Sequence, residues 1–498
     1  MDERDEDRTG AADDLFQRTA DLARWLVERD RLSPVTPPPS PEQLRAELDL
    51  SLPAEPRQEG EWFDALREVV ERTPSTSSHR FYNQLFAGRI PAATVAEALT
   101  ALLNSSMYTY KAAGVHTLIE RRVIARLCEL VGYRSGGGTF APGGSMANLV
   151  ALIVARNEAF PRVRDEGGAA AAGAVVYVSD QGHYSIRKNA GMLGIGRANV
   201  RAVRSDHEGR MIPSALSEAI AADREAGRTP LCVVATAGTT VMGAFDPIDE
   251  IATLCERERI WLHVDAAFGG SFLLHPELRQ RLRGVERSNS VAWCAHKMMG
   301  VPMPCSAILV RYAERSSSGS GASPGGEDPN LLRRHFNEAA DYLFQQDEAD
   351  LNLGHESLQC GRRNDAFKLW AAWQALGDRG WRERLERQRH LALTAVARIE
   401  REPALELLHR PESLCVCFTV SGVASDELCA ELSRRGLESV GYGLVRGAKA
   451  VRLVTSNPEV TEGEIERFFD DLLAVADDLR RRGGAAAATT ESVAATRE

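Results

Sequence analysis

"LCVVATAGTTVMGAFDPIDEIATLCERERIWLHVDAAFGG", residues 231–270, contains two continuous apolar runs separated by an amphipathic segment. The runs at 231–238 and 260–265 have the composition of strands that are covered on both faces. Between them, Asp246 can cap a helix, Pro247 suits its first position, and the apolar residues that follow share one helical face. Strand, helix and strand in this order are typical of a parallel sheet with helical layers.

Two further apolar runs, at 174–179 and 290–295, repeat the pattern in the middle of the chain. The alternation predicts an α/β fold, with a mostly parallel sheet in a large central domain. Beyond residue 376, helical segments and the runs "LCVCFTV" and "AVRLVTS" predict a smaller α+β domain.

The chain is expected to divide into four segments. These are an N-terminal helical segment (1–80), a large domain (81–375), a small C-terminal domain (376–482) and a disordered tail (483–498). In the first segment, Ser40 and Pro41 follow a proline-rich linker and begin a helix. A stretch rich in serine and glycine at 316–329 predicts a flexible insertion.

Composition and charge exclude several classes of protein. The 498-residue chain is 44% hydrophobic and 26% charged, and its formal net charge is −10. A nucleic-acid-binding protein would normally carry a basic face. No apolar stretch approaches the ~20 residues of a membrane-spanning helix, and the acidic N-terminus differs from a secretory signal. We therefore expect a cytoplasmic protein that binds neither membrane nor nucleic acid.

The nine cysteines are scattered and contain no CxxC pair. Cys415 and Cys417 alternate in an apolar run, which places both on one face of a strand. We interpret the cysteines as reduced packing residues, and we expect neither a disulfide framework nor a metal site.

Polar residues follow the predicted strands where a doubly wound sheet binds its ligand. Asp265 ends one strand, His296 and Lys297 end another, and Thr240 and His183 follow two more. A buried carboxylate needs a cationic partner or hydrogen-bond donors, and a buried lysine also needs compensation. These positions are therefore candidates for one shared site.

A turn before an apolar helix adds a candidate phosphate site. "FAPGGSMANLVAL" places Gly143, Gly144 and Ser145 at the start of that helix. Backbone N–H groups at a helix N-terminus bind phosphate well.

Pyridoxal 5′-phosphate (PLP) is one cofactor that needs all of these groups together. Its aldehyde takes a lysine and its ring nitrogen takes an aspartate. Lys297 would form the Schiff base, Asp265 would keep the ring nitrogen protonated, and His183 could cover one face of the ring. The phosphate is assigned to Gly144, Ser145 and His296.

Longer motifs resemble the group II PLP-dependent amino acid decarboxylases, closest to the cysteine sulfinate, aspartate and glutamate decarboxylase branch. They are "ATAGTTVMGAFDPI", "LHVDAAFGG", "HKMMGVP", "CSAILV" and "QCGRRNDAFKLW". The resemblance extends over about residues 41–473. It implies a fold-type I, aminotransferase-like architecture and a homodimer with shared active sites, in which the N-terminal segment embraces the partner. It also implies α-decarboxylation of a small acidic L-amino acid to the amine and carbon dioxide.

The resemblance assigns the same roles to Lys297, Asp265 and His183, and it places Thr240 near the cofactor. Tyr342 in "ADYLFQQ" matches the mobile-loop tyrosine that protonates the intermediate carbon after carbon dioxide leaves. In the family this loop reaches the active site of the partner.

Three residues match substrate contacts of the family. Gln84 matches a substrate-contacting glutamine, and Arg452 matches an arginine that binds a substrate carboxylate. Phe86 stands where the animal glutamate decarboxylases have serine and the cysteine sulfinate and aspartate type has phenylalanine or tyrosine. A bulky ring shortens the pocket, so we expect aspartate or cysteine sulfinate as substrate, ahead of glutamate.

The chain departs from the family pattern at two places. Cys294 and Ala295 replace an Asn-Pro pair whose asparagine helps to hold the phosphate, and Lys111 replaces an acidic residue. These departures leave open a PLP decarboxylase of another small or non-proteinogenic amino acid in a specialised pathway.

Two other classes of function are remote alternatives. "GGSMA" differs from the serine-hydrolase motif G-x-S-x-G at its last position, and that function would leave Lys297 and Asp265 without a role. An inactive scaffolding homologue would not need the lysine, the aspartate and Tyr342 that the chain retains.

Overall fold

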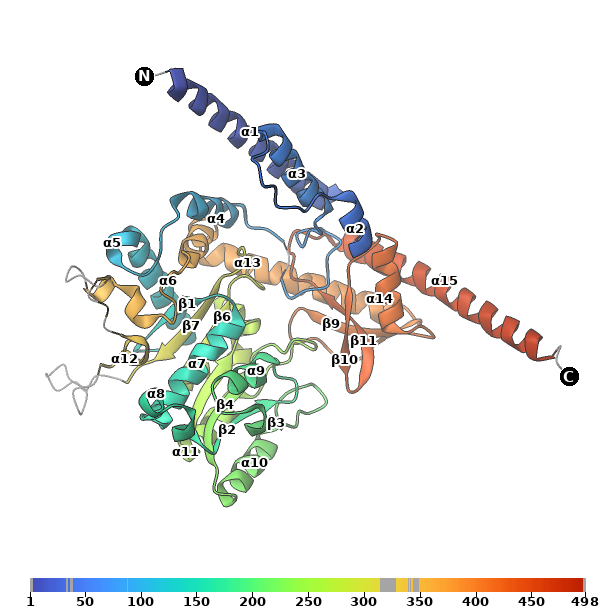
Figure 1. Cartoon of the computed structure of the whole chain (residues 1–498). Coiled ribbons are helices and arrows are strands. Elements are labelled where there is room, and N and C mark those ends of the chain that lie inside the picture. Colours follow the sequence, from blue (N-terminus) through green and yellow to red (C-terminus); the bar gives the residue numbers. More distant parts are fainter. Residues whose placement is uncertain are drawn as a thin grey trace.

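The computed structural model describes residues 3–32, 35, 39–86, 88–313, 328–338, 340, 342–343 and 349–495. It contains an N-terminal helical arm, a large α/β domain and a small α+β domain (Figure 1). The insertion predicted at 316–329 lies almost wholly outside the described residues. Among the helices that the structure describes, none is both long and apolar enough to cross a membrane.

Seven strands form the central sheet in the order β1-β7-β6-β5-β4-β2-β3. Strand β7 is antiparallel to both of its neighbours, and the other pairs are parallel. The strands are β1 (Gly136–Ala141), β2 (Ala174–Ser179), β3 (Val200–Val203), β4 (Thr229–Thr236), β5 (Trp261–Asp265), β6 (Ser290–Cys294) and β7 (Ser306–Arg311). The four apolar runs correspond to β2, β4, β5 and β6, which confirms the predicted fold class.

Helices cover both faces of this sheet. Helices α7 and α9 pack on one face, and α6, α10 and α11 pack on the other (Figure 1). The helices of this domain are α4 (Pro91–Leu103), α5 (Tyr110–Ala113), α6 (Val115–Val131), α7 (Gly144–Ala159), α8 (Val163–Glu166), α9 (Ser185–Met192), α10 (Pro213–Glu225), α11 (Ile248–Glu258) and α12 (Leu331–Phe336). The strands between these layers are continuously apolar because both faces are buried.

The helix predicted between β4 and β5 is α11, but Asp246 does not cap it. Helix α11 begins at Ile248, and Pro247 occupies the N-cap position without a side-chain cap. The buried carboxylate of Asp246 instead accepts the backbone N–H groups of Met211 and Thr236, each at 2.7 Å. Burial raises the pKa of Asp246 to about 7. The side chain therefore joins the loop before α10 to the end of β4.

A four-stranded antiparallel sheet, in the order β10-β11-β9-β8, forms the small domain with the second half of α13. Its elements are α13 (Asp365–Arg401), β8 (Leu405–Leu407), β9 (Cys415–Val420), α14 (Ser425–Arg434), β10 (Gly441–Val445), β11 (Ala448–Val454) and α15 (Glu462–Ala495). The boundary predicted at 375–376 falls inside α13, next to its break at Gly377, where φ is +58°. Two helical segments that meet at this kink therefore link the domains.

Helix α15 includes most of the tail predicted at 483–498. The backbone is helical to Ala495, which differs from the expected irregular tail. The tail begins with two glycines, which disfavour a helix, but a run of four alanines follows them, and alanine has the highest helix propensity.

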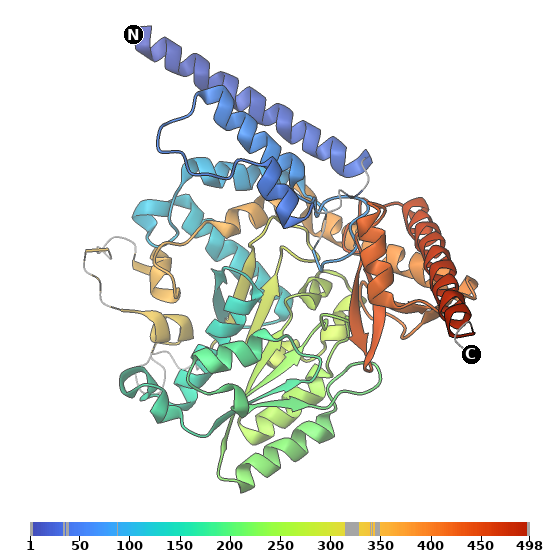
Figure 2. The same cartoon turned by 45° about the vertical axis from the view of Figure 1, so that its right-hand side comes forward.

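The N-terminal arm comprises α1 (Glu3–Leu32), α2 (Pro41–Glu47) and α3 (Glu59–Arg72). As predicted, α2 begins at Pro41, and the Ser40 hydroxyl accepts the backbone N–H of Gln43 in a capping box. Helices α1 and α3 lie side by side and project from the body of the molecule (Figures 1 and 2).

All nine cysteines carry free thiols, and eight of them are buried. Cys415 and Cys417 both lie in the core of β9, which confirms their interpretation as packing residues. Cys360 is the exposed exception.

Candidate active site

The carboxyl ends of β4, β5 and β6 bring the predicted catalytic residues to one edge of the sheet. Asp265 ends β5 and pairs in register with Thr236 of β4 and Ala292 of β6. Lys297 lies in the turn after β6, where its N–H donates to the carbonyl of Cys294 at 3.3 Å. The predicted convergence of these two residues is therefore present.

His183 lies in the loop between β2 and α9, close to the same pair. Its Nδ1 atom is 2.8 Å from the Ser185 hydroxyl. Burial lowers the pKa of His183, Asp265 opposes this shift, and Lys297 adds to it. The imidazole therefore interacts electrostatically with both Asp265 and Lys297, and burial favours its neutral form.

The carboxylate of Asp265 is held by neutral donors. Its exposed fraction is 5%. It accepts the side-chain amide of Asn148 at 2.8 Å and the backbone N–H of Ala267 at 3.1 Å. Asn148 belongs to α7, so the helix that covers the sheet also orients this side chain.

His263 contacts Asn148, and Asn148 in turn donates to Asp265, so the three side chains form one hydrogen-bond network. Its Nε2 atom is 2.9 Å from the Asn148 carbonyl oxygen, and its Nδ1 atom is 2.9 Å from the Ser290 hydroxyl. Burial lowers the pKa of His263 to about 4, so the ring is neutral at neutral pH. The sequence patterns do not single out His263 or Asn148. The alternation of His263 with Asp265 along β5 is the signal that places them on one face of the strand.

The turn between β1 and α7 has the geometry expected of a phosphate site. Gly143 has a φ of +99°, and a Cβ atom there would meet no atom within 4 Å. Within the described residues, neither the N–H nor the hydroxyl of Ser145 has a hydrogen-bond partner. The Asn189 amide donates to the Ser145 carbonyl at 2.8 Å and fixes the turn from the other side. This turn can therefore receive an anion.

His296 lies buried beside the turn after β6. Its Nδ1 atom is 3.1 Å from the N–H of Cys305 and 3.4 Å from the Ser306 hydroxyl. Burial lowers the pKa of His296 to about 4, so this side chain is a neutral neighbour of Lys297. Its Nδ1 side is already occupied within the protein, which leaves Nε2 as the nitrogen for a ligand.

PLP fits these residues. In the described structure Asp265 is a buried carboxylate with no ion-pair partner, and its neighbour His263 is neutral. A protonated ring nitrogen would supply the missing positive charge. The open space at Gly143 and the free donors of Ser145 suit the phosphate.

The predicted substrate residues lie on a segment held by the small domain. The N–H of Tyr82 donates to the Ser439 carbonyl at 2.8 Å, and its carbonyl accepts the N–H of Val454 at 3.1 Å. Gln84 is exposed and Phe86 is half-buried, and both follow this anchored stretch.

Arg452 connects this segment to the large domain. Its exposed fraction is 9%. Its two terminal nitrogens donate to the carbonyls of Asn83 at 2.5 Å and Thr240 at 2.7 Å. Its Nε has no partner in the described structure. The guanidinium therefore joins Thr240 to Asn83, the residue before Gln84.

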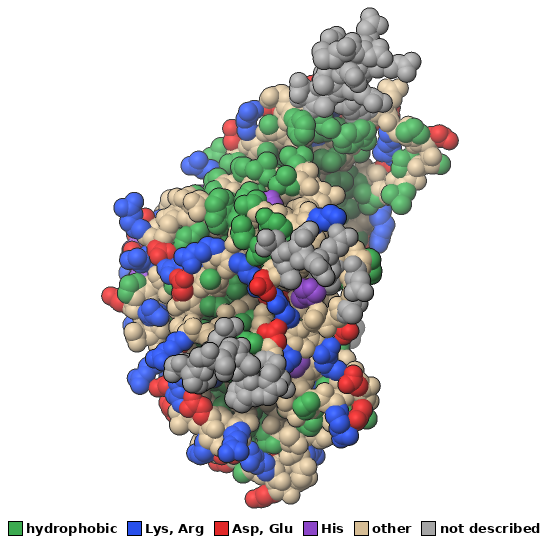
Figure 3. Space-filling view, turned by 90° about the vertical axis from the view of Figure 1, so that its left-hand side faces the viewer, with side chains coloured by type: hydrophobic (Ala, Val, Ile, Leu, Met, Phe, Trp, Pro, Cys, Tyr) green, Lys and Arg blue, Asp and Glu red, His purple; other side chains and the backbone are tan. Residues whose placement is uncertain are grey.

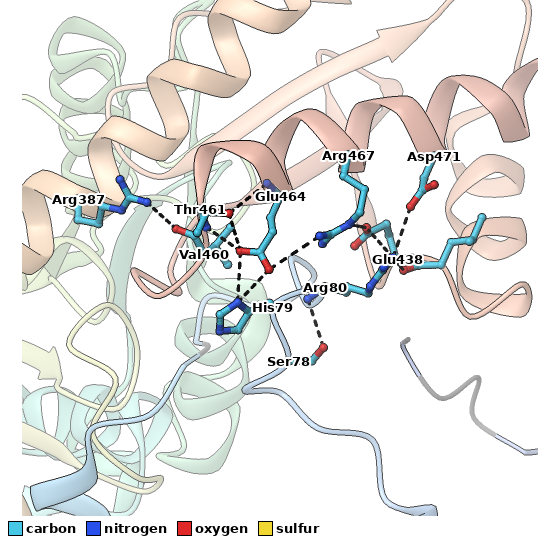
Figure 4. Close-up of polar contacts among 11 residues, drawn as sticks. Ser78, His79, Arg80, Arg387, Glu438, Val460, Thr461, Glu464, Arg467 and Asp471 are labelled. Atoms are coloured by element: carbon cyan, nitrogen blue, oxygen red, sulfur yellow. Dashed lines mark hydrogen bonds and ion pairs between the residues drawn. The ribbon is translucent and has the colours of Figure 1, made fainter. Parts of the chain in front are cut away.

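An ionic cluster secures the start of the same segment (Figure 4). Arg80 pairs with Glu438 at 3.3 Å and with Asp471 at 3.4 Å, and Arg467 also pairs with Glu438. His79 lies 3.0 Å from Glu464. Residues of α15 and of the loop before β10 thus hold the chain just before Phe81, Gln84 and Phe86.

Tyr342 lies apart from the strand-end residues. The side chain of Tyr342 is 82% exposed. In the described structure it interacts electrostatically with the hydroxyl of Tyr108. Lys111, the replacement noted in the sequence, is exposed on α5. Within one chain, the described structure therefore does not bring Tyr342 into contact with Lys297 or Asp265.

A model of the pyridoxal-dependent decarboxylase conserved domain matches residues 41–421. The cysteine sulfinic acid decarboxylase of Mus musculus is 37% identical over 462 residues, which are 88% of this chain and 90% of that protein. The acidic amino acid decarboxylase GADL1 of Homo sapiens is 35% identical over 460 residues, which are 88% and 85%.

Two solved structures of decarboxylases are also similar to this chain. The crystal structure of mouse CSAD in apo form is similar with a TM-score of 0.84 at 34% identity, covering 93% of this chain and 98% of that one. Oryza sativa TDC, solved with PLP and tryptamine, has a TM-score of 0.84 at 25% identity, with coverages of 94% and 99%.

Proposed function

The chain belongs to the pyridoxal-dependent decarboxylase family, and we propose that it removes the α-carboxylate of a small acidic L-amino acid as carbon dioxide. Family membership sets the cofactor, PLP, and the reaction class, that of a carboxy-lyase. We favour aspartate or cysteine sulfinate over glutamate. The names of the relatives support an acidic substrate, and a hydrolase or an inactive scaffold is set aside.

We assign the cofactor to residues from both sides of the strand ends. Lys297 would hold the aldehyde carbon, and Asp265 would hold the ring nitrogen. His183 would lie against the ring, and Thr240 would lie near it. The phosphate would contact Gly144, Ser145 and His296. Bound there, PLP supplies an electron sink for the pair of electrons left when the carboxylate departs.

The residues of the chain then have separate tasks. Asp265 maintains the positive charge at the ring nitrogen, because its carboxylate has no other cationic partner in the described structure. His183 is neutral and can carry a proton at the site. The Lys297 amine would hold the cofactor between turnovers and would exchange places with the amine of the substrate and of the product. Tyr342 delivers the proton that replaces carbon dioxide.

The observation that carries the substrate class is the position of Arg452. Its buried guanidinium lies between the carbonyls of Asn83 and Thr240, next to the segment of Gln84 and Phe86. A buried arginine with an unpaired Nε favours an anionic group on the substrate. The ring of Phe86 limits the length of the side chain that fits.

We also infer a cytoplasmic homodimer with shared active sites. An exposed apolar surface covers α4 and the start of α6 (Figure 3). It consists of Val95, Leu99, Leu102, Leu103, Val115 and Leu118. Contiguous apolar surface of this kind marks an interface. In such a dimer each site would use the partner's Tyr342, a role for which this residue is available because it is 82% exposed in a single chain.

A panel of amino acids tests the proposal. Carbon dioxide release is measured with aspartate, cysteine sulfinate, glutamate and neutral amino acids. We expect turnover with the first two, slower turnover with glutamate and none with the neutral amino acids. Preference for a neutral amino acid would contradict the assigned substrate class and favour the specialised decarboxylase.

Two variants test the assigned residues. Lys297→Ala should abolish turnover and the visible absorbance of the bound cofactor. Phe86→Ser should raise the ratio of kcat/KM for glutamate to that for aspartate about tenfold, since a few methylene contacts change specificity by this order. An unchanged ratio would refute the argument from pocket length.

A further inference from the structure

Cys294 lies directly beneath the turn that is assigned to the phosphate. It is the last residue of β6 and pairs in register with Ser306 of the antiparallel neighbour β7. Its side chain is fully buried. Cys294 precedes His296 by two residues along the chain. A substitution at Cys294 would therefore act on the part of the site that is assigned to the phosphate.

The sulfur of Cys294 fills the space behind Gly144. A Cβ atom at Gly144 would lie 2.9 Å from this sulfur and 3.3 Å from the Cβ of Ala267. A Cβ atom is essentially never found 2.9 Å from a sulfur, so the backbone at Gly144 packs directly against the thiol and the position requires glycine. The sulfur therefore fixes how far the turn can move toward the sheet.

A hydrogen bond ties the same sulfur to the other side of the site. The Ser306 hydroxyl donates to the Cys294 sulfur at 3.0 Å. It also lies 3.4 Å from Nδ1 of His296. The turn at Gly144, the thiol, the Ser306 hydroxyl and the imidazole thus form one continuous chain of contacts.

The thiol is neutral in this environment. Burial raises the pKa of Cys294, while Lys297, the Ser306 hydroxyl and the backbone N–H of Gly144 oppose the shift. A thiolate beside the phosphate would repel it, whereas a neutral sulfur supports the turn without adding negative charge. The charge state is therefore compatible with an anion on the far side of Gly144.

We propose that Cys294 is a positioning residue for the phosphate turn. Its sulfur supports Gly144 from below, and the Ser306 hydroxyl links that sulfur to His296. The turn is thereby held in the conformation that leaves the N–H and hydroxyl of Ser145 free for the phosphate. This inference rests on the proposed function, because it concerns how the chain holds PLP.

The test measures cofactor binding rather than turnover. Apo forms of the unaltered chain, Cys294→Ala, Ser306→Ala and the double variant are titrated with PLP, and the ³¹P resonance of each complex is recorded. We expect about tenfold weaker binding for Cys294→Ala and a shifted ³¹P resonance, as for other residues that orient a ligand contact. The double variant should weaken PLP binding by less than the two single effects combined, because Ser306 acts in part through the same sulfur.

Cys232→Ala is the matched control. Cys232 is a buried thiol in β4 of the same sheet, away from the turn. The control should lose a similar amount of thermal stability and keep the affinity and the ³¹P resonance of the unaltered chain. If Cys294→Ala does not fold, Cys294→Ser replaces it. The shorter reach of its hydroxyl withdraws part of the support, and we expect about threefold weaker binding and a shifted resonance.

Unaltered affinity and resonance in the Cys294 variants would overturn the inference, and so would equal weakening in Cys232→Ala. Fully additive effects of the Cys294 and Ser306 changes would overturn the proposed link between them. Failure of the unaltered chain to bind PLP would instead contradict the cofactor assignment, so the two failures are distinguishable.

Discussion

Asn148 determines the environment of the carboxylate that faces the cofactor site. Its amide is the only side-chain donor to Asp265 in the described structure, and it also joins His263 to the network. Asn148→Ala removes this donor and leaves a buried carboxylate oxygen without a partner, at a cost of about 1–3 kcal/mol. We expect kcat to fall about 10- to 100-fold, because Asp265 then holds the ring nitrogen less well.

Steady-state kinetics and the absorbance of the bound cofactor measure this effect. Asn157→Ala is a suitable control, because Asn157 is buried on the same helix and its side chain contacts Arg156. It should leave kcat unchanged. An Asn148→Ala enzyme with the kcat of the unaltered chain would show that Asp265 does not depend on this donor.

His263 makes stability depend on pH in a defined direction. Its pKa is about 4 in the folded protein and about 6.5 when unfolded, so the unfolded chain binds the proton more strongly between these values. Stability is therefore fully present above pH 6.5 and is lost as pH falls toward 4. From pH 7 to pH 5 this residue should lower the free energy of unfolding by about 2 kcal/mol.

Urea unfolding of the unaltered chain and of His263→Gln at both pH values isolates this contribution. Glutamine keeps the hydrogen-bonding capacity without titrating, so the fall in stability between pH 7 and pH 5 should be smaller by that amount. The exposed His207, replaced by glutamine, should leave the pH dependence unchanged. An identical fall in stability for the unaltered chain and His263→Gln would contradict a neutral buried His263.

At this scale, sequence patterns found the charged residues but not their supports. Asp265 and Lys297 stand where buried strands end, and a charge in an apolar context is visible in the sequence. Asn148 lies in the second turn of the apolar helix α7, and its role depends on which face α7 turns toward β5. That relation is tertiary, and a helical period alone does not contain it.

The ionic cluster of Figure 4 acts on an element, the segment that carries Gln84 and Phe86. Glu438 has an exposed fraction of 0% and lies between Arg80 and Arg467. Burial raises the pKa of Glu438 to about 8, and the two arginines oppose this shift, so the carboxylate depends on both of them for its charge. Glu438→Ala leaves two guanidinium groups without their shared carboxylate, so we expect a loss of about 2–4 kcal/mol in the free energy of unfolding. We also expect a several-fold rise in KM with little change in kcat, because the segment loosens while the strand ends are unaffected.

Glu466→Ala on α15 is the control for this variant. Glu466 is half-exposed and pairs with Arg398 and Arg401 at the surface, where an ion pair contributes about 0–1 kcal/mol. Its KM should equal that of the unaltered chain. If Glu438→Ala lost stability but kept its KM, the cluster would stabilise the small domain without positioning the substrate segment.

Strands were predicted more accurately than the ends of helices. A strand buried on both faces is a continuous apolar run, and the runs at 174–179 and 290–295 lie on β2 and β6. Helix ends depend on longer-range partners. Asp246 has the residue type of a cap, yet backbone donors from two distant segments engage it. The boundary expected near residue 376 falls inside α13, where Gly377 has a non-helical conformation and joins two helical segments at a kink.

The exposed Tyr342 and the apolar surface on α4 and α6 require an explanation at the scale of the whole molecule. If two copies associate through this surface, each site combines Lys297 of one copy with the partner's Tyr342. Lys297→Ala and Tyr342→Phe chains should then each be inactive alone. Refolded or co-expressed together, they should recover about one quarter of the activity of the unaltered enzyme, because half of the randomly formed dimers contain both variants and each of these has one intact site.

Two measurements make this prediction specific. Leu99→Glu places a charge in the apolar surface and should give a monomer by light scattering, with loss of activity. The same substitution in both complementing chains should abolish their recovery. Leu393→Glu, on the exposed side of α13, should leave the mass and the recovery unchanged. Full dimers without recovery would place Tyr342 in the site of its own chain and would confine the apolar surface to a purely structural role.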